Sequence, residues 1–383
     1  MQNTPRTSRS VNALRRRLRP LPLALALLAG GLATPASALD YLWVGGSGSW
    51  ADAANWSPGG VPGAADRATI NNGNHAVIVT GARSVGALAL TDGYLGGTGV
   101  LNTGSASFGS AVLGLSTSTE NTLNVSGAAS FNGANVATLR YGQVLNLNGN
   151  TTWSAGNGRI DIGYSYAGNA TTDPHRTSAL NINAGATFTD AGAAAAAGTK
   201  QIGYDGGQIN NAGTYVCNGL GLTEASHGFN NTGTVNVNAG TFRLTGSTLR
   251  SRSSGLVNVA AGAALDLGNV DITAGTIANS GRVQLITNAA TTVAAGASIN
   301  GIWNIGHNSA VLLLNGSHSI SALNMTDGYL GGTGVLNTGS ASFGSAVLGL
   351  STSTENTLNV SGAVQTLRRC WQRVQAMLLD QSV

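Results

Sequence analysis

Charge, aromatic side chains, cysteine and proline are all scarce in this chain. Of its 383 residues only 9 % are charged and 5 % are aromatic, and it contains 2 Cys and 7 Pro. Two Cys in so long a chain exclude a disulfide scaffold, and few Pro without a three-residue glycine period exclude collagen. A hydrophobic content of 42 % argues against disorder, because disordered chains combine high net charge with few apolar residues.

Basic residues are concentrated at the N-terminus, where six of the 19 Lys and Arg lie in the first 20 positions. An apolar run from Leu21 to Leu32 follows, and then Ala36-Ser37-Ala38. This order is typical of a secretory signal peptide, whereas a membrane anchor needs ~20 apolar residues. We therefore predict that residues 1–38 are a leader cleaved after Ala38.

Removal of this leader changes the charge of the protein. The remaining chain has 13 basic residues (19 minus 6) against 15 acidic ones, a net charge of −2. Its only lysine is Lys200, and its arginines are scattered. No basic stripe is available to neutralise phosphates, which argues against nucleic-acid binding.

Internal repetition is the strongest pattern in the sequence. Residues Thr91 to Ala128 recur as Thr326 to Ala363, and all 38 positions match. This identity indicates a recent duplication or an artefact of sequence assembly. After the second copy, residues 364–383 change character, with three Arg and no Gly. We interpret this atypical tail as a frameshift, a recombination junction or a premature stop rather than a designed helix.

A subtler repeat consists of eleven apolar–x–apolar triplets whose centres are 20 to 35 residues apart. In eight of them the central residue is asparagine: Asn124, Asn146, Asn181, Asn236, Asn258, Asn304, Asn324 and Asn359. Alternation bounded by Gly, Asn, Ser and Thr predicts short strands, and the 56 Gly disfavour helix. The body is therefore predicted to be all-β.

The spacing favours a solenoid over other all-β folds. A period of ~20–26 residues is the length of one coil in a stacked array. We predict an all-β, right-handed parallel β-helix (solenoid) over residues 85–363, with an N-terminal cap over 39–84. The 35-residue spacings would be coils with a looped-out excursion or one and a half coils. Inward or corner asparagines would form an amide ladder between coils. A sandwich or tandem β-domains remain the alternative.

Three of the six Trp, Trp43, Trp50 and Trp56, lie in the predicted cap. Exposed indoles that stack on sugar rings would suit glycan contact. Packing over the open end of the solenoid is the commoner role, since an unprotected edge invites aggregation.

Candidate catalytic groups are dispersed. The only grouping that stacked coils could assemble is Asp161 with Asp205 or Glu224, near Lys200 and Arg159. Paired carboxylates of this kind support acid–base catalysis in β-helical polysaccharide lyases and hydrolases. Solvated coil corners are the simpler interpretation, and we predict no catalytic residue.

Metal and cofactor sites are not predicted. The histidines lie in separate segments without the spacing of zinc ligands: His75, His175, His227, His307 and His318. The stretch Gly96-Gly97-Thr98-Gly99 lacks the Asp of a calcium repeat and the Lys of a phosphate loop. Cys217 lies at an inward triplet position, so we expect a buried thiol. Its one possible disulfide partner, Cys370, is in the atypical tail, and no disulfide is predicted.

Several segments resemble large bacterial surface proteins. Near the N-terminus, the segments that resemble these proteins are Trp43-Val44-Gly45-Gly46-Ser47-Gly48-Ser49-Trp50 and Gly60-Val61-Pro62-Gly63-Ala64-Ala65-Asp66. In the repeat body, they are Val112-Leu113-Gly114-Leu115 and Ile162-Gly163-Tyr164. These segments resemble passenger repeats of autotransporters and haemagglutinin-like adhesins over most of residues 40–363. The resemblance implies an extracellular β-helical passenger in adhesion or surface display. The family's translocator and sorting signal are not found, so the chain looks like a passenger fragment.

These observations predict an exported, non-enzymatic protein of the bacterial surface, acting in adhesion or self-association. Its partners would be host or bacterial surface glycans or proteins, or further copies of itself. Membrane association would come only through a missing translocator or anchor. The alternatives are a β-helical carbohydrate-active enzyme and a passive structural spacer.

Overall fold

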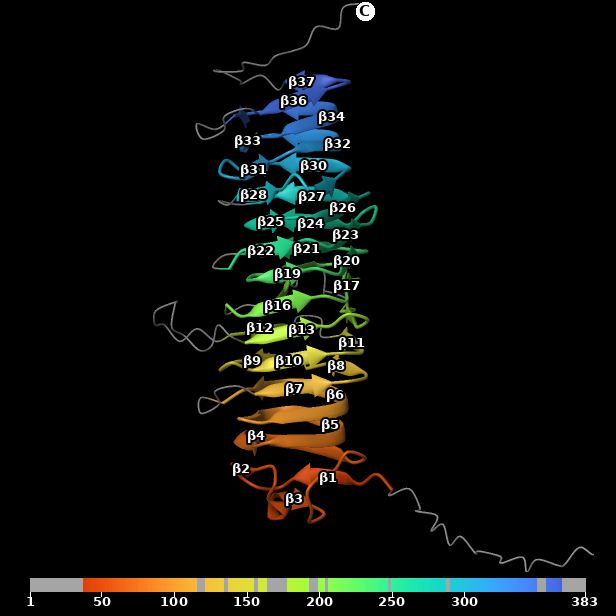
Figure 1. The fold of residues 1–383 in the computed structure, drawn as a ribbon, viewed down its shortest axis with the longest axis vertical. Helices are drawn as coiled ribbons and strands as arrows, with labels where there is room; N and C mark the ends of the chain where they lie inside the picture. The colour runs from red at the N-terminus through yellow and green to blue at the C-terminus, as the bar shows by residue number, and fades with distance from the viewer. Residues whose placement is uncertain are drawn as a thin grey trace, which may run out of the picture. The chain divides into compact units, whose positions relative to one another are not determined.

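The computed structural model describes residues 37–115, 121–133, 137–154, 158–163, 178–192, 199–203, 206–246, 249–286, 290–349 and 356–366. Nearly all of these residues belong to one parallel β-solenoid of about 12 turns. Successive coils stack along the long axis, from β4 (Arg67–Val79) near one end to β37 (Val364–Thr366) at the other (Figure 1). The predicted all-β parallel β-helix is therefore confirmed.

The solenoid has three faces, because each strand from β7 to β28 pairs in parallel register with the strand three elements later along the chain. Face 1 contains β8 (Ala129–Phe131), β11 (Asn150–Trp153), β14 (Thr187–Asp190), β17 (Thr214–Cys217), β20 (Thr234–Val237), β23 (Leu256–Val259), β26 (Gly275–Asn279), β29 (Ala297–Ile299) and β36 (Thr357–Val360). Face 2 contains β9 (Ala137–Leu139), β12 (Arg159–Ile162), β15 (Thr199–Ile202), β18 (Leu222–Ala225), β21 (Thr241–Leu244), β24 (Ala264–Leu267), β27 (Arg282–Leu285), β30 (Ile302–Ile305) and β37. Face 3 contains β7 (Thr122–Val125), β10 (Val144–Leu147), β13 (Ala179–Ile182), β16 (Gln208–Asn211), β19 (Phe229–Asn231), β22 (Ser251–Ser253), β25 (Val270–Ile272), β28 (Ala290–Val293), β31 (Val311–Leu314), β33 (Tyr329–Gly332) and β35 (Val347–Leu348).

Five long strands span more than one face. They are β4, β5 (Ala82–Gly97), β6 (Val100–Leu113), β32 (Ser317–Met325) and β34 (Val335–Phe343). Four of them, all except β32, contain glycine where the chain passes from one face to the next. At Gly97, with φ of 133°, a Cβ atom would lie 2.0 Å from the Val79 carbonyl oxygen. Only glycine fits this position, because both the backbone angle and the space exclude a side chain.

The cap is shorter than the sequence indicates. It contains β1 (Asp40–Trp43), β2 (Gly48–Ser49), a 3-10 turn at Ala53–Asn55 and β3 (Trp56–Ser57). Strand β4 already pairs in parallel with β5, so the coils begin inside the predicted cap range of 39–84. At the other end, Val364–Thr366 pairs with β34, so the solenoid continues three residues into the predicted tail. Residues 367–383 and the proposed leader, apart from Ser37 and Ala38, lie outside the described residues.

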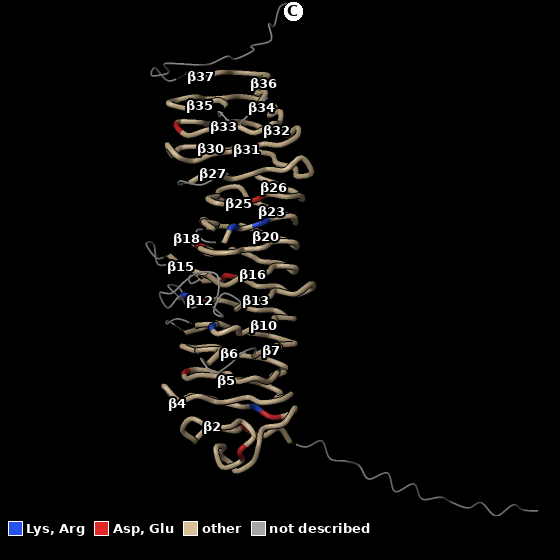
Figure 2. Tube along the Cα trace, turned by 60° about the vertical axis from the view of Figure 1, so that its left-hand side comes forward, with Lys and Arg blue, Asp and Glu red and all other residues tan. Residues whose placement is uncertain are grey.

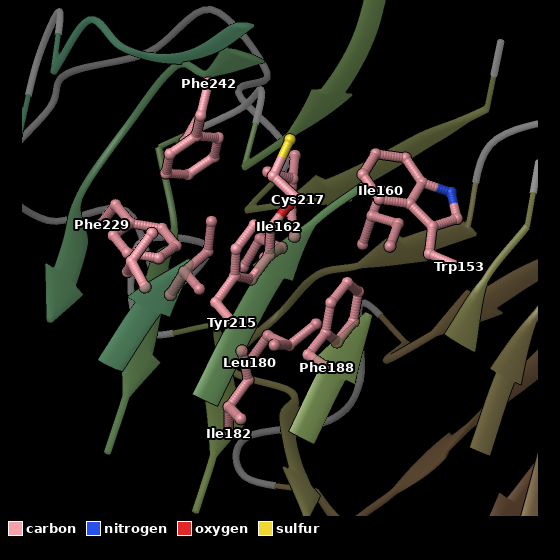
Figure 3. Close-up of a cluster of buried hydrophobic side chains, with 14 of the residues drawn as sticks. Trp153, Ile160, Ile162, Leu180, Ile182, Phe188, Tyr215, Cys217, Phe229 and Phe242 are labelled. Atoms are coloured by element: carbon pink, nitrogen blue, oxygen red, sulfur yellow. The ribbon is translucent and has the colours of Figure 1, made fainter. Parts of the chain in front are cut away.

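The core consists of inward aliphatic side chains and a stack of aromatic rings (Figure 3). Phe108 and Phe131 have ring centroids 4.9 Å apart. Phe188 and Tyr215 lie 5.4 Å apart and nearly parallel, and Tyr215 continues to Phe242 at 5.1 Å. The first two pairs stack because residues in register on successive coils point to the same side of the sheet, whereas Phe242 lies in β21 on face 2 and meets Tyr215 from a different face.

The duplicated segment occupies different faces in its two copies. Tyr94–Gly97 pairs on face 2, where Tyr94 and Leu95 lie beside Val112 and Leu113. The identical Tyr329–Gly332 pairs with β31 on face 3. The segment is therefore compatible with more than one face, and part of the irregular spacing of the triplets reflects shifts between faces.

Candidate functional site

The three cap tryptophans are buried. Trp50 is 0 % exposed, and Trp43 and Trp56 are 3 % and 2 % exposed. Trp56 makes edge-to-face contacts with Trp43 and Trp50 at centroid distances of 4.9 and 4.8 Å. Its Nε1 donates a hydrogen bond to the Trp50 carbonyl at 2.9 Å. Their placement matches the capping role, and no indole face is open for a sugar ring to stack on.

The asparagines lie within the strands on the outer surface of the sheets, not inward or at corners as expected. In β10, Leu145 and Leu147 are buried while Asn146 between them is half-buried and faces outward. The eight predicted asparagines also do not form one column. Face 3 contains Asn124, Asn146 and Asn181, face 1 contains Asn236, Asn258 and Asn359, and face 2 contains Asn304 and Asn324.

Side-chain amides nevertheless form ladders between coils. On face 3, each Nδ2 donates to the Oδ1 of the preceding coil at 2.7–3.0 Å, through Asn102, Asn124, Asn146, Asn181, Asn210 and Asn230. Shorter ladders join Asn236 to Asn258, Asn304 to Asn324 and Asn337 to Asn359. The apolar–x–apolar triplets do not include Asn102, Asn210, Asn230 and Asn337. The duplication does mark two of them, because Asn102 and Asn337 occupy the same position in its two copies. We call the six-membered row on face 3 the asparagine ladder.

Charged residues are sparse, and a group of them lies beside β23 and β25 (Figure 2). On face 2, Glu224, Arg243 and Asp266 are in register on three successive coils. Arg243 donates from Nε and Nη2 to Asp266 at 3.2 and 3.0 Å, and its Nη1 lies 4.0 Å from Glu224. Arg282 approaches Asp266 at 3.9 Å. Opposite charges alternate along this row, so the charges neutralise one another.

Face 3 carries a second charged pair. Arg250 donates to Asp271 from Nε at 2.8 Å and from Nη2 at 2.5 Å, and Thr292 also donates to this carboxylate. Burial by itself raises the pKa of Asp271, but the hydrogen bonds from Arg250 and Thr292 outweigh it and hold the pKa below the usual 3.8.

Asp161 and Glu224, two of the three carboxylates considered for catalysis, are not brought together as a pair. Asp161 is tied to Arg159, with 2.6 Å between Arg159 Nε and Asp161 Oδ1. Arg159 pairs with Gln201 on one coil, and Gln201 pairs with Glu224 on the next coil, so Arg159 and Glu224 are two coils apart. Asp161 lies two residues beyond Arg159 on the same strand. Two coil spacings amount to about 10 Å, beyond the ~5–9.5 Å between the carboxyl groups of glycosidases. Asp205 lies outside the described residues.

Lys200 points into the core instead of joining these groups. It is 1 % exposed and forms an ion pair with Asp190, which is 0 % exposed. The Nζ also donates to the Trp153 carbonyl at 3.2 Å and lies 3.9 Å from the centre of the Trp153 ring. The Thr223 hydroxyl donates to the other carboxylate oxygen of Asp190. The sequence pattern does not mark Asp190, since a charged residue at the last inward position of β14 departs from the apolar alternation.

Two further titratable groups, Cys217 and Tyr215, lie next to Asp190. Cys217 is adjacent in register, and its thiol is buried, as predicted. Burial raises the pKa of Cys217 to about 12, and the negative charge of Asp190 adds to this effect. Burial raises the pKa of Tyr215 well above its usual value, and electrostatic interactions with Asp190 and Cys217 raise it further. Asp190, Lys200, Thr223, Tyr215 and Cys217 thus form a buried polar cluster within an apolar column.

Metal-binding groups do not gather in the described part of the chain, where no three His, Cys, Asp or Glu side chains lie together. His75, His227, His307 and His318 lie in different coils, and His175 is outside the described residues. Among the described residues, no helix has the length and hydropathy needed to cross a bilayer.

Comparison with known proteins gives no match: no family model, no curated protein and no solved structure is similar to this chain.

Proposed function

We propose that this chain is an exported, non-enzymatic protein of the bacterial surface whose solenoid acts in adhesion or self-association. The asparagine ladder is the observation that supports this proposal. Six outward amides follow one another at the ~4.8 Å spacing of parallel strands. Each of the four inner amides uses one N–H and one lone pair for hydrogen bonds to its neighbours and retains a second donor and acceptor.

A repeated row of donors and acceptors suits a partner that is itself repetitive. A polyhydroxylated glycan or the face of a second solenoid can make many weak hydrogen bonds to such a row. Multiple weak contacts raise overall affinity without a deep pocket. The alternating charges of Glu224, Arg243 and Asp266 present little net charge, which favours neutral partners over strongly charged ones.

A large charged side chain introduced beside the asparagine ladder tests the proposal, because it obstructs face 3 while every ladder residue is kept. Gln208 is an exposed residue of β16 on face 3, beside Asn210. The variant Gln208→Arg should keep its melting temperature and lose binding to polysaccharide arrays or self-association measured by sedimentation. Leu256→Arg on face 1, where Leu256 is 37 % exposed, is the matched control and should bind as the parent does.

Equal binding by both variants would contradict a role for face 3. Polysaccharide depolymerisation that disappears in Asp161→Asn would overturn the non-enzymatic proposal and favour a carbohydrate-active enzyme. Detection of the mature chain starting at residue 39 outside the cell tests export.

A further inference from the structure

Lys200 and Asp190 form an unusual pair for this protein. Lys200 is the only lysine in the chain, although the chain has 19 basic residues. Arginine stays protonated in proteins, whereas a buried lysine can lose its proton and act as a neutral amine. The one residue able to supply a nucleophilic amine side chain is thus placed in the core, in contact with a buried carboxylate.

The fold holds the two groups in place from several sides. Asp190 lies in register between Trp153 on the coil below and Cys217 on the coil above. Lys200 lies beside Thr223 of the coil above. The Trp153 carbonyl accepts one hydrogen bond from Nζ, and Thr223 holds one carboxylate oxygen. This leaves the other carboxylate oxygen directed at Nζ.

We propose that Lys200 and Asp190 condense to an amide bond inside the folded coil. A proton first passes from Nζ to the carboxylate, giving a neutral amine and a neutral acid. The Nζ lone pair attacks Cγ of Asp190 and a new C–N bond forms. One C–O bond then breaks, and that oxygen leaves as water with its own proton and one from the amine. No oxidant, metal or other reactant is needed.

The surroundings favour each part of this reaction. A buried ion pair carries a large desolvation cost, and conversion of the two charged groups to an uncharged amide removes that cost. Fixed contact between two reacting groups corresponds to effective concentrations of roughly 10⁵–10⁸ M. The Thr223 hydroxyl donates to the carboxyl group and stabilises negative charge that develops on its oxygen. Exclusion of water disfavours the reverse hydrolysis.

The presence of a single lysine makes the test decisive. The full chain is purified, denatured and treated with an amine-reactive reagent, and its intact mass is measured before and after. An amide predicts a mass lower by one water and a single label, at the N-terminus. The full mass with two labels would overturn the proposal and leave an ordinary ion pair.

Two controls separate this amide from other losses of water. Cyclisation at an Asp-Gly sequence, such as Asp92-Gly93 or Asp327-Gly328, also removes one water but leaves Lys200 free to react with the label. Water loss with two labels would therefore count against the proposal. The variant Lys200→Arg keeps a positive charge but cannot form the amide, so it should show the full mass. Water loss that persists in Lys200→Arg would contradict the assignment, and the measurement on the unaltered chain stands even if this variant does not fold.

Discussion

Tyr94 and Tyr329 have identical neighbours in the sequence, yet Tyr94 lies on face 2 and Tyr329 on face 3 of the solenoid. Each face requires the same alternation of inward apolar and outward polar residues. The sequence of a segment therefore determines that it stacks on the neighbouring coil more strongly than it determines which of the three faces it occupies.

This equivalence predicts that a whole coil can be removed. Thr234 and Leu256 are in register on adjacent coils, so deletion of residues 234–255 connects Gly233 to a strand that fits the vacated place. The shortened chain should keep its β circular dichroism and a cooperative thermal transition. Loss of that transition would show that the coils are not interchangeable.

The aromatic stack predicts a large effect of Phe188→Ala. Phe188 is 0 % exposed and lies 5.4 Å from the Tyr215 ring and 6.1 Å from the Phe131 ring. Removal of a buried phenylalanine costs about 3–5 kcal/mol. Denaturant unfolding measures the loss. Leu220→Ala, at a side chain that is 77 % exposed, is the control and should change stability by no more than ~0.5 kcal/mol. Similar effects of both changes would argue against a packed stack.

Asn146 is inside the asparagine ladder, with hydrogen bonds of 2.7 Å to Asn124 and 2.8 Å from Asn181. Asn146→Ala removes one hydrogen bond from each neighbour, so that Asn124 Oδ1 and Asn181 Nδ2 lose their ladder partner, and we expect a loss of about 1–2 kcal/mol in the free energy of unfolding. Asn74→Ala, at an exposed position of β4, should have almost no effect. A neutral Asn146→Ala would mean that water replaces the ladder at no cost.

Asp271 should make stability depend on pH in acid. Because its folded pKa lies below the usual 3.8, its contribution is present above pH ~4 and is lost as pH falls through the folded pKa. Asp271→Asn should therefore be less stable than the parent at neutral pH, and the difference should shrink below pH 3.8. Thermal melts across this range test it. A difference independent of pH would assign the effect to packing.

Cys217 should be unreactive in the folded chain. With its pKa raised to about 12, the thiol is protonated at pH 8 and is also buried, and the thiolate is the reactive form. In a Cys370→Ser background, a thiol reagent should label Cys217 slowly until denaturant is added. Rapid labelling of the native chain would indicate that this corner opens readily.

The type of fold could be predicted from the sequence because it depends on local rules. Alternating triplets such as Leu145-Asn146-Leu147 specify a strand with one apolar side, and spacing of 20–22 residues at triplets on one face specifies the length of a coil. The buried thiol of Cys217 followed from the same alternation. These patterns act within a few residues, so they are visible without coordinates.

Which segments meet was decided only by the tertiary structure. Whether a triplet lies on face 1, 2 or 3 depends on the sum of all corner lengths before it, so Asn236 and Asn304 looked equivalent to Asn146 but lie on other faces. The partner of Lys200 is ten positions away, across a corner. Alternation marks which side chains point inward, whereas the chain's path between strands determines which of them touch.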